Sequence, residues 1–228
     1  MHPTISVGSC LDEGVRNLKE NFWPFILVVI IISILESFGN SSAVRQGMDG
    51  GHAFFISPVS GGFISFIVAV FIKPVFDFGG QLLFVRGNRG EDFEVADITE
   101  GFSSKELFID IVLANLMIVV LVILGFICLI LPGIYIACRL VLASYLVMDK
   151  GLAPKQALKG SWELMRDFWP QVILMGLIAA FLCIFGLILF VVGIFPAVAL
   201  IKAMFASFYQ KVIDAHEDDF LRSLGIKP

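Results

Sequence analysis

Residues 107–131 read LFIDIVLANLMIVVLVILGFICLIL, and this stretch decides the class of fold. A helix that crosses the hydrocarbon core of a bilayer needs about 17–25 largely apolar residues. The stretch has that length, and its single carboxylate, Asp110, lies near its start. Pro132-Gly133 follows directly, a pair that is typical of a helix break. We therefore predict a transmembrane helix at 107–131 that ends in a tight turn.

The composition of the whole chain agrees with this prediction. Hydrophobic residues make up 58% of the chain, the mean hydropathy is +0.92, and only 16% of residues are charged. Soluble domains carry about a quarter charged residues. The net charge of −4, with no basic face, argues against a nucleic-acid partner. The four cysteines show no CxxC spacing, so we expect no disulfide framework, metal site or other cofactor.

The same criterion predicts further spans along the chain. They are Trp23–Phe38, Phe63–Val85, Ile134–Met148, Trp169–Val191 and Ala197–Val212. The predicted fold is an all-α polytopic integral membrane bundle, with about six transmembrane helices in three hairpins and amphipathic interfacial helices. The predicted segments are an interfacial helix at 1–22, a hairpin at 23–85, a cytoplasmic loop at 86–106, a hairpin at 107–149, an interfacial helix at 150–168, a hairpin at 169–213 and a cytoplasmic tail at 214–228.

Two other interpretations, a signal peptide and a calcium-binding loop, are disfavoured by the sequence. The first span resembles a signal peptide, because Ser41-Ser42-Ala43 has the pattern of a cleavage site, but the segment before the span is too long and too acidic. The acidic loop 87–104 lacks a DxDxDG pattern, and we expect it to be solvated.

The basic residues of the loops predict the orientation. With the N-terminus inside, the outside segments hold Arg45 as their single lysine or arginine, and all other loop lysines and arginines are cytoplasmic. Positive loop residues favour the cytoplasmic side. We therefore expect a prokaryotic plasma (inner) membrane protein with both termini in the cytoplasm.

A short internal repeat marks two entries into the membrane. Residues 18–24 read LKENFWP and residues 164–170 read LMRDFWP. In both places an amphipathic stretch, expected to lie in the headgroup plane, leads into an apolar span. Trp23, Trp162 and Trp169 are predicted at the membrane interface, where an indole ring is apolar and its N–H stays hydrated.

Small residues follow one face of the last predicted span. Ala199, Ala203 and Ser207 recur every four residues. Such a row lets helix backbones approach closely, either within one chain or between two copies.

The stretch from 125 to 169 carries a resemblance to a known family. It reads GFICLILPGIYIACRLVLASYLVMDKGLAPKQALKGSWELMRDFW, with Leu-Pro-Gly, one basic residue in the following span, and Ser161-Trp162 before an aromatic re-entry. Residues 80–215 thereby resemble uncharacterised prokaryotic polytopic membrane proteins related to the membrane domain of glycerophosphoryl diester phosphodiesterases, and YciC-like proteins. The resemblance implies no phosphodiesterase activity here, because no segment is long enough for a catalytic barrel and the histidines are His2, His52 and His216.

Polar residues inside the spans are the candidate binding residues. At about 1.5 Å of rise per residue, six of them fall near the middle of an approximately 30 Å core. They are Glu36, Lys73, Asp77, Asn115, Arg139 and Lys202. Charges at this depth are costly, so we expect them to face inward and pair.

The expected pairing leaves one cation over. Lys73 and Asp77 are four residues apart on one helix, and Glu36 is expected to pair with Arg139 or Lys202. The remaining cation is predicted to bind an anionic lipid or small anion. The alternatives are a closed network that holds helices together, or side chains that reach to an interface.

The sequence favours a non-enzymatic membrane protein that binds or scaffolds lipids or partner proteins, with a second copy of the chain as one such partner. A transporter or channel subunit for a small anionic solute is the alternative. An enzyme acting on lipid headgroups ranks third. It would need a cluster of carboxylates or histidines at the cytoplasmic interface, and Asp110, Asp149 and Asp167 are weak candidates for it.

Overall fold

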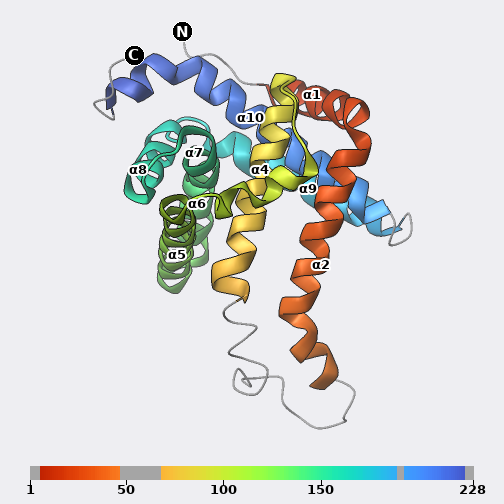
Figure 1. Cartoon of the computed structure of the whole chain (residues 1–228). Helices are drawn as coiled ribbons and strands as arrows, with labels where there is room; N and C mark the ends of the chain where they lie inside the picture. The colour runs from red at the N-terminus through yellow and green to blue at the C-terminus, as the bar shows by residue number, and fades with distance from the viewer. Residues whose placement is uncertain (1–5, 47–67, 189–192, 224–228) are drawn as a thin grey trace.

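The computed structural model describes residues 6–46, 68–188 and 193–223, and all regular structure in these ranges is helical (Figure 1). The predicted all-α class is therefore confirmed. The elements are α1 (Val7–Glu20), α2 (Phe22–Gln46), the π-helix η1 (Val68–Ile72), α4 (Lys73–Arg89), the 3-10 helix η2 (Val95–Phe102), α5 (Lys105–Cys128), α6 (Ile130–Leu140), α7 (Ala143–Lys150), α8 (Pro154–Leu164), α9 (Trp169–Ile188) and α10 (Ile194–Ser223).

Within the described ranges, three helical segments are long and apolar enough to cross a membrane. They are Lys105–Cys128, Ile130–Lys150 and Trp169–Leu187, and a fourth is added if α1 and the first part of α2, which meet at 97°, count as one span. Only 17% of the most apolar stretch of α5 is buried, and the same share of α9. Such extensive apolar surface is expected where lipid lies outside. The helices thus indicate membrane association, while six spans in three hairpins stay a prediction.

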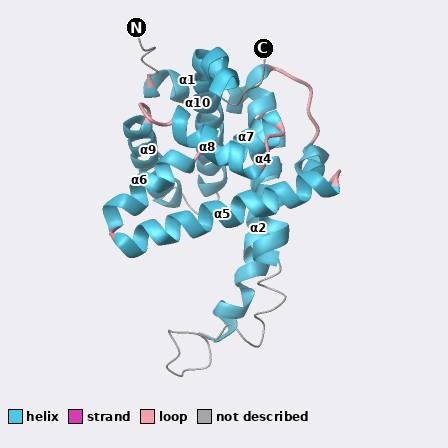
Figure 2. Ribbon diagram, turned by 90° about the vertical axis from the view of Figure 1, so that its left-hand side faces the viewer, coloured by secondary structure: helices cyan, strands magenta, loops and turns pink. Residues whose placement is uncertain are grey.

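The buried core lies between α2, α4, α7 and α10. Its largest fully buried side chains include Phe25, Leu83, Phe84, Leu146, Phe208 and Tyr209. In Figures 1 and 2, α10 passes through the molecule beside α4, whereas α5 lies transverse to α2. The chain therefore has a packed helical centre and an outer shell, formed by α5 and α9, that is apolar and exposed.

The predicted first break, at Pro132-Gly133, is displaced by a few residues. Helix α5 ends at Cys128, Leu129 is extended, and Pro132 falls in the first turn of α6. Proline is tolerated there because the first N–H groups of a helix have no intrahelical acceptor. The turn is tight because Gly125 and Gly133 meet: a Cβ on Gly125 would lie 2.9 Å from the Gly133 Cα.

The two Phe-Trp-Pro segments both begin long helices. Helix α1 ends at Glu20 and α2 begins at Phe22; α8 ends at Leu164 and α9 begins at Trp169. Each short helix before the turn buries one side and exposes the other, as the predicted amphipathic pattern requires. Whether the two segments are copies of one repeat stays a prediction.

Helix α1 packs against α10 through a small residue on each side. A Cβ on Gly14 would lie 3.1 Å from the Met204 backbone nitrogen, and the neighbouring Ala203 is fully buried. Part of the predicted small-residue row on α10 is therefore used for packing inside the chain.

Loop 87–104 exposes most of its acidic residues, as predicted, but it also contains a short helix that the sequence did not predict. Its central part forms η2, which packs against α4, and Ile98 is buried. Gly79 allows the approach, because its missing side chain leaves room for the carbonyl group of Ile98. Arg86 then pairs with Glu100 at 2.8 Å and with Asp97 at 3.4 Å. The acidic residues were noted in the sequence, but the close approach at Gly79 and the burial of Ile98 were not predicted.

The predicted boundary of the C-terminal tail also differs. Helix α10 continues without a break to Ser223 and so includes the first part of the predicted tail at 214–228. Pro74 lies in the first turn of α4, where the π-helix η1 changes to an α-helix. Because proline has no N–H, it removes one hydrogen bond at this change of helix type.

Candidate functional site

Arg139 lies in the last turn of α6. Among the residues that the structure describes, it is the one charged residue that is buried, with 5% of its surface exposed. Its Nη1 donates to the hydroxyl of Tyr135, one helical turn earlier, at 2.8 Å. Its Nε is buried and has no hydrogen-bond partner in the described part of the chain. A guanidinium offers five N–H donors, so this one keeps unused capacity.

Helix α8 covers the guanidinium with an aromatic ring. The Arg139 Cζ lies 4.5 Å from the centre of the Trp162 ring and 5.5 Å from that of Tyr135. Tyr135 meets the Trp162 and Trp169 rings edge to face at 6.0 and 5.6 Å. The attraction between a cation and an aromatic face contributes about 0.5–2 kcal/mol, less than a buried charge loses by leaving water.

Ser161 fixes α8 to the end of α6. Its hydroxyl donates to the backbone carbonyl of Arg139 at 2.8 Å, and Ser161 is fully buried. The chain turns at Val141-Leu142 between α6 and α7, so the carbonyl lies where regular helical bonding stops. The Ser161 bond satisfies it and places Trp162, the next residue, over the guanidinium.

A hollow of about 730 Å³ opens at this point, and we call it the Arg139 pocket. Its lining residues are Tyr135, Arg139, Trp162, Glu163, Arg166 and Asp167. Glu163, Arg166 and Asp167 are exposed and lie at the end of α8 and in the turn before α9. Within the described residues, no carboxylate lies within 4.0 Å of the Arg139 guanidinium, so the pocket contains a buried positive charge that is not neutralised by an ion pair.

A second polar cluster, the Asp149 cluster, is closed. Arg89 of α4 makes two bonds to the Asp149 carboxylate of α7, at 2.5 and 2.8 Å, and the Tyr209 hydroxyl of α10 donates to the same carboxylate at 2.8 Å. The hydrogen bonds to Asp149 raise the pKa of Arg89 above its ordinary value, so the guanidinium stays charged. The Tyr145 ring stacks on Tyr209 at 5.1 Å. This cluster joins α4, α7 and α10.

A third polar group lies between α1, α4 and α10. The amides of Asn17 and Asn88 are in hydrogen-bonding contact, and Asn88 is bonded to the Ser207 hydroxyl at 2.7 Å. These residues line a hollow of about 290 Å³, with Lys211 bound to Glu13 at 3.0 Å at its edge. The side chains of Asn17, Asn88 and Ser207 thus find hydrogen-bond partners within the group. We therefore interpret the group as a structural contact between the three helices.

The six predicted midplane residues do not gather at one described place. Arg139 lies in the pocket of α6 and α8; Asn115 is half-buried on α5. Lys73 and Asp77 of α4 and Lys202 of α10 each have an interaction partner. The side chain of Glu36 lies outside the described residues, so its predicted ion pair stays a prediction.

The prediction separated Arg139 from the interface tryptophans, whereas the structure brings them together. Arg139 was expected at mid-depth and Trp162 and Trp169 at the surface of the bilayer, yet Arg139 contacts Trp162 directly, and Tyr135 bridges to Trp169. Trp23, in contrast, is 73% exposed at the start of α2 and lies in a T-shaped contact with Phe22. Arg139 therefore lies beside tryptophans that were predicted at the interface, and its depth in a membrane stays a prediction.

Sequence analysis missed Tyr135 at this site, and Arg89 and Tyr209 at the Asp149 cluster. Tyr135 had a signal, because a residue four positions before Arg139 on a helix lies on the same face. Arg89 and Tyr209 had none, since their meeting with Asp149 depends on how three distant helices pack.

Comparisons of the chain with protein-family models, with curated proteins and with solved structures found no match.

Proposed function

We propose that this protein is a non-enzymatic integral membrane protein that binds a lipid headgroup in the Arg139 pocket. The observation that carries the proposal is Arg139, which is 5% exposed and which, within the described residues, has no carboxylate partner for its guanidinium and no acceptor for its Nε. A phosphodiester supplies acceptor oxygens and a negative charge, which is what this guanidinium lacks.

The surroundings of the pocket support a lipid as the source of that phosphate. Trp162 and Trp169 are partly exposed beside it, and tryptophan is enriched where hydrocarbon meets headgroups. The outer face of α9 begins at Trp169 and exposes Ile173, Leu174 and Leu177. A headgroup in the pocket would leave its acyl chains along this apolar face.

The non-enzymatic part of the proposal rests on the carboxylates. Asp149, the most buried of the three named above, is fully engaged by Arg89 and Tyr209 and has no free oxygen for proton transfer. The resemblance to the phosphodiesterase-related membrane domain agrees with a headgroup as ligand, and it stays part of the proposal.

The finer topology is also proposed. Six spans, cytoplasmic termini and residence in a prokaryotic inner membrane are supported by the distribution of loop lysines and arginines. Helix α1 and the C-terminal part of α10 lie at the same end of the molecule in both views (Figures 1 and 2). Reporter fusions at Gln46 and at the C-terminus would test this: an extracytoplasmic signal from the C-terminal fusion contradicts it.

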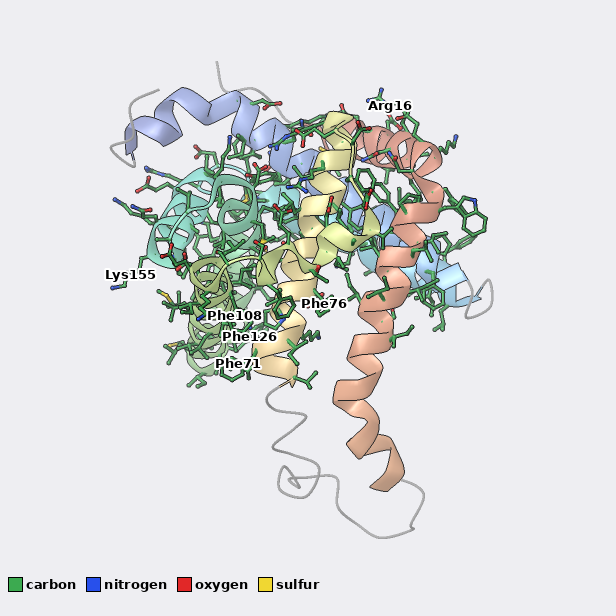
Figure 3. All side chains as sticks on the ribbon, in the orientation of Figure 1. Arg16, Phe71, Phe76, Phe108, Phe126 and Lys155 are labelled. Atoms are coloured by element: carbon green, nitrogen blue, oxygen red, sulfur yellow. The ribbon has the colours of Figure 1, made fainter. Side chains whose placement is uncertain are left out.

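Native mass spectrometry from mild detergent tests the binding proposal. We expect the wild type to retain phospholipid and Arg139→Leu to lose it. Lys155→Leu is the matched control, because it removes one positive charge from α8 at a side chain that points away from the bundle (Figure 3). Equal lipid retention by all three proteins would contradict the proposal, and uptake of phosphate into proteoliposomes would indicate the transport alternative.

A further inference from the structure

The Arg139 pocket is lined by charges of both signs. Arg139 and Arg166 are positive, and Glu163 and Asp167 are negative, so the lining carries no net formal charge. A pocket that selects an anion over other ligands presents a surplus of positive charge, because electrostatic complementarity determines specificity. A lining with equal numbers of positive and negative charges fits a ligand that also carries one group of each sign.

One positive charge of the lining lies deeper than the carboxylates. Arg139 is 5% exposed, whereas the Glu163 side chain is 46% exposed, and Asp167 and Arg166 are also exposed. A ligand would therefore meet positive charge deep in the pocket and carboxylates at its opening. Its negative group should lie inside and its positive group outside.

The aromatic walls suit a cation at the opening. Trp162, which lines the pocket, is 39% exposed, and the face of such a ring attracts ammonium groups. The hollow of about 730 Å³ is within the range of about 300–1,000 Å³ found for small-molecule sites. The space is sufficient for a headgroup with two charged groups.

We propose that the Arg139 pocket selects a zwitterionic phospholipid. Its phosphodiester accepts hydrogen bonds from the Arg139 guanidinium and from Arg166, and its ammonium group pairs with Glu163 and Asp167 beside Trp162. This inference rests on the proposed function, since it names the class of lipid that the same pocket binds. The bidentate geometry of a guanidinium suits the phosphate, and the carboxylates supply the discrimination.

The test uses the full-length protein in nanodiscs that contain equal amounts of phosphatidylethanolamine and phosphatidylglycerol, followed by native mass spectrometry of the retained lipids. We expect the wild type to retain phosphatidylethanolamine over phosphatidylglycerol by about fivefold. In Glu163→Gln/Asp167→Asn this preference should disappear while phospholipid is still retained. Both side chains are exposed, so the variant should fold.

The possible outcomes separate the two proposals. Selectivity for a zwitterionic lipid is contradicted if the wild type prefers phosphatidylglycerol, or if the preference is unchanged in Glu163→Gln/Asp167→Asn. Lipid binding in the pocket is not contradicted by either result. Retention of both lipids by Arg139→Leu at the wild-type level overturns lipid binding in the pocket and the zwitterion with it. Binding of soluble glycerophosphoethanolamine in place of the lipid, measured by calorimetry, overturns the membrane lipid as ligand.

Discussion

Two arginines of this protein are held in opposite ways. The Arg89 side chain is 25% exposed, and its guanidinium is paired with the Asp149 carboxylate. That carboxylate also accepts a hydrogen bond from the Tyr209 hydroxyl. Arg139 is 5% exposed, and among the residues that the structure describes its guanidinium contacts a tyrosine hydroxyl and aromatic faces but no carboxylate. The more deeply buried charge is thus the one with the poorer internal partners.

The difference separates a structural contact from a binding site. A buried charge that is fully paired joins the elements that supply it, and its removal costs stability. A buried charge that is not paired lowers stability unless a ligand completes it. The Asp149 cluster belongs to the first kind and the Arg139 pocket to the second, and each prediction below tests that contrast.

The largest effect is expected from Asp149→Ala. The change leaves Arg89 and Tyr209 without their acceptor between α4, α7 and α10, and the loss of one partner from a buried pair costs about 3 kcal/mol. Thermal or denaturant unfolding in detergent measures it. Glu91→Ala is the matched control, since Glu91 lies 3.9 Å from the same guanidinium but is 48% exposed, and we expect a change below about 0.5 kcal/mol. Equal effects of the two variants would mean that the cluster is not structural.

Arg139→Leu should act on binding and not on folding. Without lipid, the unfolding free energy should fall by less than about 1 kcal/mol or rise, because an unneutralised buried charge is replaced by an apolar group. Phospholipid affinity should fall by at least about tenfold, which corresponds to about 1.4 kcal/mol. A titration with short-chain phospholipid measures the affinity. A loss of stability as large as that of Asp149→Ala would make Arg139 a structural residue.

Ser161→Ala should have an intermediate effect on both properties. It removes the bond to the Arg139 carbonyl and costs about 1 kcal/mol of stability. Because α8 then no longer has a fixed position over α6, phospholipid affinity should also fall by several-fold. Ser103→Ala, in an exposed turn, is the control that should change neither quantity.

The smallest effect is expected from Trp162→Leu. The substitution keeps an apolar side chain but removes the ring 4.5 Å from the guanidinium, which costs about 0.5–1 kcal/mol. The loss should appear in phospholipid affinity, measured by the same titration. Trp23→Leu, a similar change at a tryptophan outside the pocket, should leave the affinity unchanged.

The sequence predicted the parts of the fold that depend on local pattern. The apolar run at 107–131, the start of helices at Trp23 and Trp169 and the amphipathic face of α1 follow from periodicity and composition, and the structure has each of these helices. Arg139 was found because a charge in an apolar stretch is conspicuous. Each of these features depends on residues that are close together in the sequence.

Features that depend on contacts between distant segments were not predicted. Arg89 and Asp149 are 60 residues apart, and their meeting follows from the packing of α4 against α7. The packing of η2 against α4 required Gly79, whose role becomes clear only when Ile98 lies against it. Trp162 reaches Arg139 because Ser161 binds α8 to the end of α6, a tertiary bond that no spacing in the sequence reveals.

The most direct test of the account is the shift in unfolding temperature when phosphatidylethanolamine is added to delipidated protein in detergent. A ligand at about 100 times its dissociation constant stabilises the folded state by about 2.7 kcal/mol, so the wild type should unfold several degrees higher with lipid. The account predicts that Arg139→Leu shows no such shift, while Lys155→Leu shifts like the wild type. An equal shift in Arg139→Leu would contradict the assignment of the pocket as the lipid site.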